Sequence, residues 1–164
     1  MVDAQLLRRP LIMKKSILLA TLIASVSVPA LAASNFNRIA SFPVYKNNME
    51  AKETSSEIID VTADGMTLVY TDSPNGTVGM IDITDPANPK ALGSLEVGGE
   101  PTAVVIQGQT AYVGVNTSES YTKPSGNVAV IDIKAEKIVK TCDVGGQPDS
   151  LAGAKDDSFI PCHR

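Results

Sequence analysis

The side chains in this sequence that could perform chemistry are carboxylates. The one histidine, His163, is the last residue but one, so a Ser–His–acid triad has no base in the body of the sequence. No Gly-x-Ser-x-Gly elbow and no His/Cys cluster of zinc spacing occurs, so no catalytic residue is predicted. Carboxylates that a fold gathers can hold calcium or a metal that bridges a phosphoester. We therefore predict Glu57, Asp72 and Asp149, at strand positions or strand ends, as candidate metal ligands and calcium as the candidate cofactor.

Two further aspartates, Asp82 and Asp132, occupy equivalent positions near the ends of two similar segments. A catalytic site rarely recurs in every repeat of a protein. A carboxylate just before the end of a strand can instead accept hydrogen bonds from the N–H groups of the following turn. We interpret Asp82 and Asp132 as structural residues.

A long polar segment, residues 116–126, separates two apolar runs in the second half of the sequence. Loops held on a rigid scaffold often carry function. We predict Asn116 and Tyr121 as candidate ligand-binding residues, with Tyr121 covering a ligand. The alternative is a loop that is simply solvated.

These candidates lie on an internal repeat, which determines the fold. The segment Gly76–Ile83 recurs as Gly126–Ile133, and the corner Gly98–Pro101 recurs as Gly145–Pro148. Each unit is predicted to contain four short strands, because turn residues separate apolar runs. The expected strands are 57–62, 67–72, 78–83, 91–97, 102–106, 110–116, 127–133 and 137–144.

Several of these strands are apolar on both faces, which predicts sheets that are stacked between other sheets. Four strands in about 45 residues is the period of a β-propeller blade. We predict an all-β fold of antiparallel four-stranded propeller blades after an N-terminal signal helix. The predicted division is a signal peptide (1–32), a lead-in segment (33–54), blade 1 (55–97), blade 2 (98–144) and an incomplete third blade (145–164).

The amino end has the pattern of a secretory signal peptide. Lys14 and Lys15 precede an apolar run, and Ala30-Leu31-Ala32 is a small-x-small cleavage pattern. The run is too short for a transmembrane span, for which about 20 apolar residues are needed. We expect translation to start at Met13, a mature end at Ala33, and a periplasmic or secreted bacterial protein.

Export permits disulfides, and the sequence has two cysteines, Cys142 and Cys162. One bridge between them is an open alternative. The favoured interpretation is that Cys142 is a half-buried strand residue.

Charge and composition exclude nucleic acid as a partner. The net charge is −4, aromatic residues make up 4% and there is no tryptophan. Nucleic-acid binding proteins need a basic surface, and single-strand platforms need aromatic rings. Four of the 14 basic residues lie in the first 15 positions, so the exported part is still more acidic.

The sequence also resembles a known family. Val78–Gly98, with Ile81-Asp82-Ile83 and Asp85-Pro86, resembles the LVIVD-type blade repeat of secreted propellers, and Ala111-Tyr112-Val113 resembles the YVTN-type repeat of surface-layer propellers. From Phe36 to Leu151 the sequence is similar to bacterial secreted proteins of the choice-of-anchor I type, which are described as esterase-like or phytase-like propellers. The resemblance implies either a metal-dependent phosphoester or ester hydrolase or a passive binding surface.

The carboxyl end departs from that family, because the third unit does not continue as a blade after Phe159. We expect a truncated amino-terminal fragment that is inactive as an enzyme on its own. The predicted function is an exported binding or scaffold module for a small-molecule or protein ligand. Part of a metal-dependent hydrolase is the alternative. Because open blades leave apolar faces uncovered, we expect the fragment to self-associate.

Overall fold

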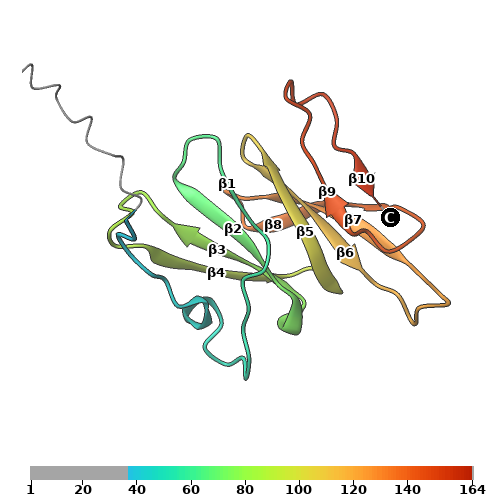
Figure 1. Cartoon of the computed structure of the whole chain (residues 1–164), viewed down its shortest axis with the longest axis horizontal. Helices are drawn as coiled ribbons and strands as arrows, with labels where there is room; N and C mark the ends of the chain where they lie inside the picture. The colour runs from blue at the N-terminus through green and yellow to red at the C-terminus, as the bar shows by residue number, and fades with distance from the viewer. Residues whose placement is uncertain (1–36, 164) are drawn as a thin grey trace, which may run out of the picture. The chain divides into compact units, whose positions relative to one another are not determined.

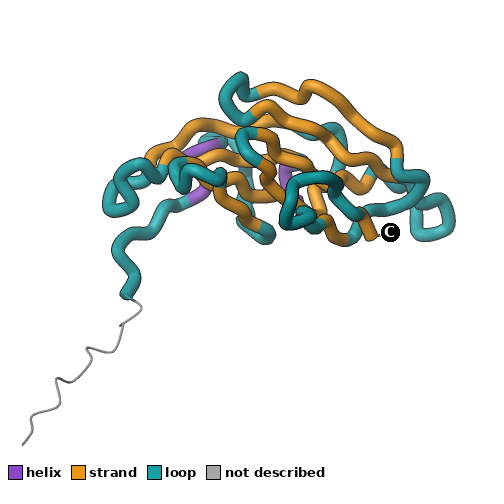
Figure 2. The backbone as a smooth tube through the Cα atoms, turned by 90° about the horizontal axis from the view of Figure 1, so that it is seen from above, coloured by secondary structure: helices purple, strands orange, loops and turns teal. Residues whose placement is uncertain are grey.

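The structure, a computed structural model, describes residues 37–163. The predicted signal peptide, its helix and the cleavage position lie outside the described residues. Within residues 37–163 the chain consists of strands and loops, and helix is confined to two short 3₁₀ segments, η1 (Val44–Asn47) and η2 (Ser73–Asn75) (Figure 2). No helix in this part of the chain is long and apolar enough to cross a membrane.

In residues 37–163, ten strands form two four-stranded antiparallel sheets and one two-stranded pair (Figure 1). In sequence order, the strands of the first sheet are β1 (Ile59–Val61), β2 (Thr67–Asp72), β3 (Thr77–Asp82) and β4 (Lys90–Glu96). Those of the second are β5 (Glu100–Gln107), β6 (Thr110–Asn116), β7 (Gly126–Asp132) and β8 (Lys137–Asp143). The pair consists of β9 (Ser150–Leu151) and β10 (Cys162–His163). The predicted fold class, all-β with antiparallel four-stranded sheets, is confirmed, and the predicted strand ends differ from the observed ones by at most two residues.

The two four-stranded sheets share details beyond strand order. In each of them the pairing of the third and fourth strands shifts register at the same repeat position, between Met80 and Ile81 in one sheet and between Val130 and Ile131 in the other. The paired residues also correspond, because Leu68 lies opposite Ile81 and Ala111 lies opposite Ile131. The sequence repeat is therefore a structural repeat.

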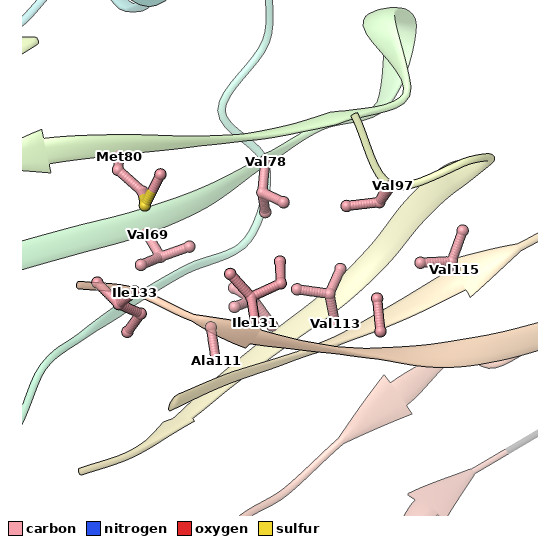
Figure 3. Close-up of a cluster of buried hydrophobic side chains, with 11 residues drawn as sticks. Val69, Val78, Met80, Val97, Ala111, Val113, Val115, Ile131 and Ile133 are labelled. Carbon is pink, nitrogen blue, oxygen red and sulfur yellow. The ribbon is translucent and has the colours of Figure 1, made fainter. Parts of the chain in front are cut away.

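The core lies between the two sheets (Figure 3). Val69 and Met80 contribute from one face of the first sheet, and Val113 and Ile131 contribute from the second sheet. Side chains alternate between the faces of a strand. In the repeat, Val113 and Ile131 correspond to Tyr70 and Ile81, which lie on the opposite face of the first sheet from Val69 and Met80. The two sheets therefore meet through non-equivalent faces. This arrangement is how successive propeller blades stack, and it explains why the strands of the first sheet are buried on the face that meets the second sheet.

The other face of the first sheet is covered by the lead-in segment. Asn47, at the end of η1, donates hydrogen bonds from Nδ2 to the Tyr70 hydroxyl and the Met80 carbonyl, both at 2.9 Å. Its Oδ1 accepts a hydrogen bond from the N–H of Gly93 at 3.0 Å. An apolar hollow of about 270 Å³ lies beside this contact, with Phe42 and Ile81 in its lining. One asparagine thus attaches the lead-in to three different strands.

The connection from β2 to β3 depends on a glycine. Gly76 follows η2 with φ of 62°, in the left-handed region. A Cβ at this position would also lie 2.9 Å from the carbonyl oxygen of Gly99, in the corner that joins the two sheets. Glycine tolerates both conditions because it has no side chain.

The cysteines lie in different sheets. Cys142 is half-buried on β8, as the favoured interpretation predicts, and Cys162 is on β10. Both lie among the described residues, and no disulfide joins them in the structure, so the alternative of one bridge is not supported.

Candidate functional site

The structure links two of the three predicted metal ligands, Glu57 and Asp72, through one shared hydrogen-bond partner, Ser55. Asp72 is 2% exposed, and its two carboxylate oxygens accept hydrogen bonds from the N–H of Ser55 at 3.0 Å and from Nδ2 of Asn75 at 2.9 Å. Glu57 accepts hydrogen bonds from the hydroxyl of Ser55 at 3.2 Å and from that of Ser73 at 2.8 Å. These contacts hold the segment before β1 against the end of β2.

The third predicted ligand, Asp149, lies just before β9. Its backbone N–H donates to the carbonyl of His163, and its carboxylate lies 3.9 Å from Nδ1 of the same histidine. Within residues 37–163, no three His, Cys, Asp or Glu side chains come close enough together to hold a metal ion. A calcium ion at Asp72 would have to reach a side chain that is only 2% exposed. The metal site therefore stays a prediction from the sequence.

The interpretation of Asp82 and Asp132 as structural residues is confirmed. Asp82 accepts hydrogen bonds from the N–H of Thr84 at 2.9 Å and from the Thr84 hydroxyl at 2.7 Å. These two hydrogen bonds lower the pKa of Asp82. Asp132 accepts a hydrogen bond from the N–H of Ala135 at 2.9 Å. Both aspartates close the turn that follows their strand.

The long loop between β6 and β7 is held by hydrogen bonds between its own ends. The hydroxyl of Ser118 donates to the carbonyl of Ser125 at 3.1 Å and accepts from the N–H of Ser125 at 3.0 Å. An isolated bridge pairs Ser120 with Lys123, whose ammonium lies 2.9 Å from the Glu119 carboxylate. The loop is therefore organised before any ligand binds.

A hollow of about 220 Å³ lies against this loop and contains both predicted ligand-binding residues, Asn116 and Tyr121. None of the side chains that line it is charged: Asn116, Ser118, Ser120, Tyr121, Pro124 and Gln147. The side chain of Tyr121 is fully exposed. We call this hollow the loop pocket.

Two amide side chains contribute to the loop pocket in different ways. Asn116 is fixed, because its Nδ2 donates to Glu100 at 3.0 Å and its Oδ1 accepts from the N–H of Ser118 at 3.0 Å. The side-chain amide of Gln147 makes no hydrogen bond to the described part of the chain. Its donors and acceptor are available to a ligand.

Gln147 was not predicted as a site residue. It belongs to the second Gly-Gly-x-Pro corner and occupies the repeat position of Glu100 in the first. The exchange of Glu for Gln at this position is the sequence signal that could have identified it, once the corner was known to lie beside the loop.

Comparison with known proteins places this geometry in context. The choice-of-anchor I domain family matches residues 57–161. A search of the curated proteins gave no match.

Two solved structures share the fold. Kuenenia stuttgartiensis hydrazine synthase is 22% identical with a TM-score of 0.56, over 66% of this chain and 29% of that one. A functionally unknown protein from Desulfotomaculum acetoxidans DSM 771 is 17% identical with a TM-score of 0.50, over 62% of this chain and 30% of the other. The chain thus spans about three tenths of each of these structures, and the similarity concerns the fold alone.

Proposed function

Because the chain belongs to the choice-of-anchor I domain family, we propose that it is an exported binding module whose ligand occupies the loop pocket. The observation that carries this proposal is the free amide of Gln147 and the exposed ring of Tyr121 beside an ordered loop. Binding sites combine a concave surface with a few polar groups that are placed before the ligand arrives. The two stacked sheets supply the rigid support.

Binding is favoured over the alternative, metal-dependent hydrolysis of a phosphoester or ester. Hydrolysis of that kind needs a metal with an open coordination position and a basic group for the phosphate. The loop pocket has no charged side chain, and Asp72 is only 2% exposed, so a substrate has little access to its carboxylate. The contacts around both candidate sites therefore support recognition rather than catalysis.

The proposal includes the larger architecture that the repeat suggests. We infer that residues 55–97 and 98–144 act as successive propeller blades, that 145–164 contribute to a third, and that 33–54 are a lead-in. The stacking of the first sheet on the second supports this division. Association between copies through the outer face of the second sheet belongs to the same proposal.

Export is tested by the mature amino terminus. We expect cleavage after Ala32, so mass spectrometry of the periplasmic or secreted protein should give a chain that begins at Ala33. A cytoplasmic product that retains Met13 would contradict the export proposal.

The binding function is tested by a ligand screen monitored at the loop pocket. We expect at least one compound in a small-molecule library to shift the NMR signals of Tyr121 and the Gln147 side-chain amide. Tyr121→Ala and Gln147→Ala should each weaken the binding of that compound. Tyr45→Ala should not, because Tyr45 is also exposed but lies on η1. A library that leaves both signals unchanged would refute the proposed function.

A further inference from the structure

We propose that the loop pocket binds one pyranose ring of a neutral saccharide. This inference rests on the proposed function and specifies its ligand class. It depends on four properties of the pocket: its charge, its size, the hydrogen-bonding capacity of its amides, and its exposed aromatic ring.

The charge around the loop pocket disfavours anionic ligands. All of its lining side chains are neutral. The two nearby charges in the loop, Glu119 and Lys123, form an ion pair with each other at 2.9 Å. The Glu100 carboxylate lies 3.0 Å from Nδ2 of Asn116, so it adds a negative charge beside the lining. An anionic ligand would lose hydration on entering the pocket without gaining an opposite charge, which is unfavourable. A phosphate or a carboxylate group is therefore a poor match, and a neutral polar ligand is a good one.

The size of the loop pocket limits the ligand to about one ring. Its volume of about 220 Å³ is below the roughly 300–1,000 Å³ that is typical of sites for drug-sized molecules. A single six-membered ring with its substituents is of the right order. A longer saccharide would contact the pocket through one sugar unit and continue over the protein surface.

The hydrogen-bonding groups of the pocket match hydroxyl groups. A side-chain amide offers both donors and an acceptor, and a sugar hydroxyl can likewise donate and accept. Gln147 has its full capacity free, whereas Asn116 is fixed by Glu100 and Ser118 and keeps part of its capacity. One amide without a hydrogen bond and one fixed amide can bind neighbouring hydroxyls of one ring.

The exposed ring of Tyr121 supplies the apolar part of the site. Its side chain is fully exposed and has no hydrogen-bond partner in the described part of the chain. An exposed aromatic side chain presents a flat apolar face and a hydroxyl at its edge. The C–H groups on one face of a pyranose are also flat and apolar. Stacking these two faces would remove apolar surface from water while the sugar hydroxyls remain free for the amides.

The repeat gives an independent reason to regard the loop pocket as a specialised site. In the first unit the connection between the second and third strands is the short η2 segment, and the following corner contains Glu100. In the second unit that connection is the long loop, and the following corner contains Gln147. The two departures from the repeat are separated in sequence, and they meet at one pocket. The second of them replaces an acidic side chain by a neutral amide, as a neutral ligand requires.

The test is an NMR titration of the exported protein with defined probes. The probes are glucose, galactose, mannose and N-acetylglucosamine, with glucuronic acid and an uncharged tetrapeptide as comparisons. We expect at least one neutral sugar to shift the Tyr121 ring and Gln147 amide signals in a saturable way, and glucuronic acid to bind more weakly than its neutral counterpart. The Kd should rise about tenfold in Tyr121→Ala and about fivefold in Gln147→Ala, as expected for loss of one stacking contact or one hydrogen bond. Tyr45→Ala should leave it unchanged, and the amide spectrum of each variant reports whether it is folded.

The outcomes separate this inference from the proposed function. If the tetrapeptide or another library compound shifts the two signals and none of the neutral sugars does, the saccharide inference is wrong and the binding function stands. If nothing shifts them, both are wrong. If a neutral sugar binds with equal Kd in the wild type, Tyr121→Ala and Gln147→Ala, it binds elsewhere and the inference is also wrong.

Discussion

Replacing Asn47 by alanine should detach the lead-in segment from the first sheet. Its side chain makes three hydrogen bonds, to the Tyr70 hydroxyl, the Met80 carbonyl and the N–H of Gly93, at 2.9, 2.9 and 3.0 Å. These partners lie on β2, β3 and β4, so one side chain contacts three strands. Alanine would remove all three contacts at once.

The magnitude follows from what the substitution leaves behind. Tyr70 is 1% exposed, and its hydroxyl would keep only a long contact to the carbonyl of Val44 at 3.4 Å. The N–H of Gly93 would lose its side-chain partner. Leaving a buried polar group unsatisfied costs about 1–3 kcal/mol, and water can reach part of this site once the lead-in moves. We therefore expect Asn47→Ala to lower the free energy of unfolding by about 2–3 kcal/mol.

The assay is urea unfolding of the exported protein, with Asn48→Ala as the matched control. Asn48 is the next residue, and its side chain makes no hydrogen bond to the described part of the chain. The double variant Asn47→Ala/Tyr70→Phe should be less destabilised than the sum of the single variants, because both remove the same hydrogen bond. Equal stability of Asn47→Ala and Asn48→Ala would show that the lead-in is not attached in this way.

Three more predictions concern the sheets. A Cβ at Gly79 would clash with the ring of Tyr70, whereas the second sheet pairs Val113 with Ala129 at these positions. Gly79→Ala should therefore lower the free energy of unfolding by about 1–3 kcal/mol in the wild type and by much less in a Tyr70→Val background, as a double-mutant cycle of unfolding would show. Ile131→Asp should lower the free energy of unfolding by several kcal/mol, because Ile131 is 2% exposed between the sheets. Val139→Asp, on the exposed side of β8, should lower it only slightly, and equal melting temperatures of the two variants would contradict the stacking. Burial raises the pKa of the Tyr70 hydroxyl. The stability that the protonated hydroxyl contributes is complete below the ordinary tyrosine pKa of about 10 and is lost as pH rises through the raised value. Above about pH 10, the urea midpoint should therefore fall less in Tyr70→Phe than in the wild type.

The strands could be predicted from the sequence because their signals are local. Turn residues such as Asn75 and Gly76 separate apolar runs, and the repeat shows each pattern twice. The stacking was also predictable, because strands apolar on both faces need cover on both sides. The turn roles of Asp82 and Asp132 followed from their equivalent positions.

The attachment of the lead-in could not be predicted, because its signals are not local. The three partners of Asn47 are 23, 33 and 46 residues away along the chain. Nothing in the sequence around η1 has a helical or strand period, and a single asparagine in a polar segment usually indicates a turn. Gln147 was missed for a related reason, since Asn116, which lines the same pocket, is at the end of β6, about 30 residues earlier in the chain.

Ile81 and Ile131 show what a repeat determines and what it leaves open. They occupy equivalent positions and are 4% and 2% exposed, so the repeat predicts burial correctly for both. However, Ile131 is covered by the first sheet, whereas Ile81 lies under the lead-in, beside the apolar hollow. The repeat fixes which face of each sheet must be covered, and the segments outside the repeat supply the cover. The loop pocket follows the same rule, because it forms where the long loop and Gln147 depart from the repeated pattern. Substitutions at repeated positions should therefore alter stability, and substitutions at Gln147 and Tyr121 should alter binding alone.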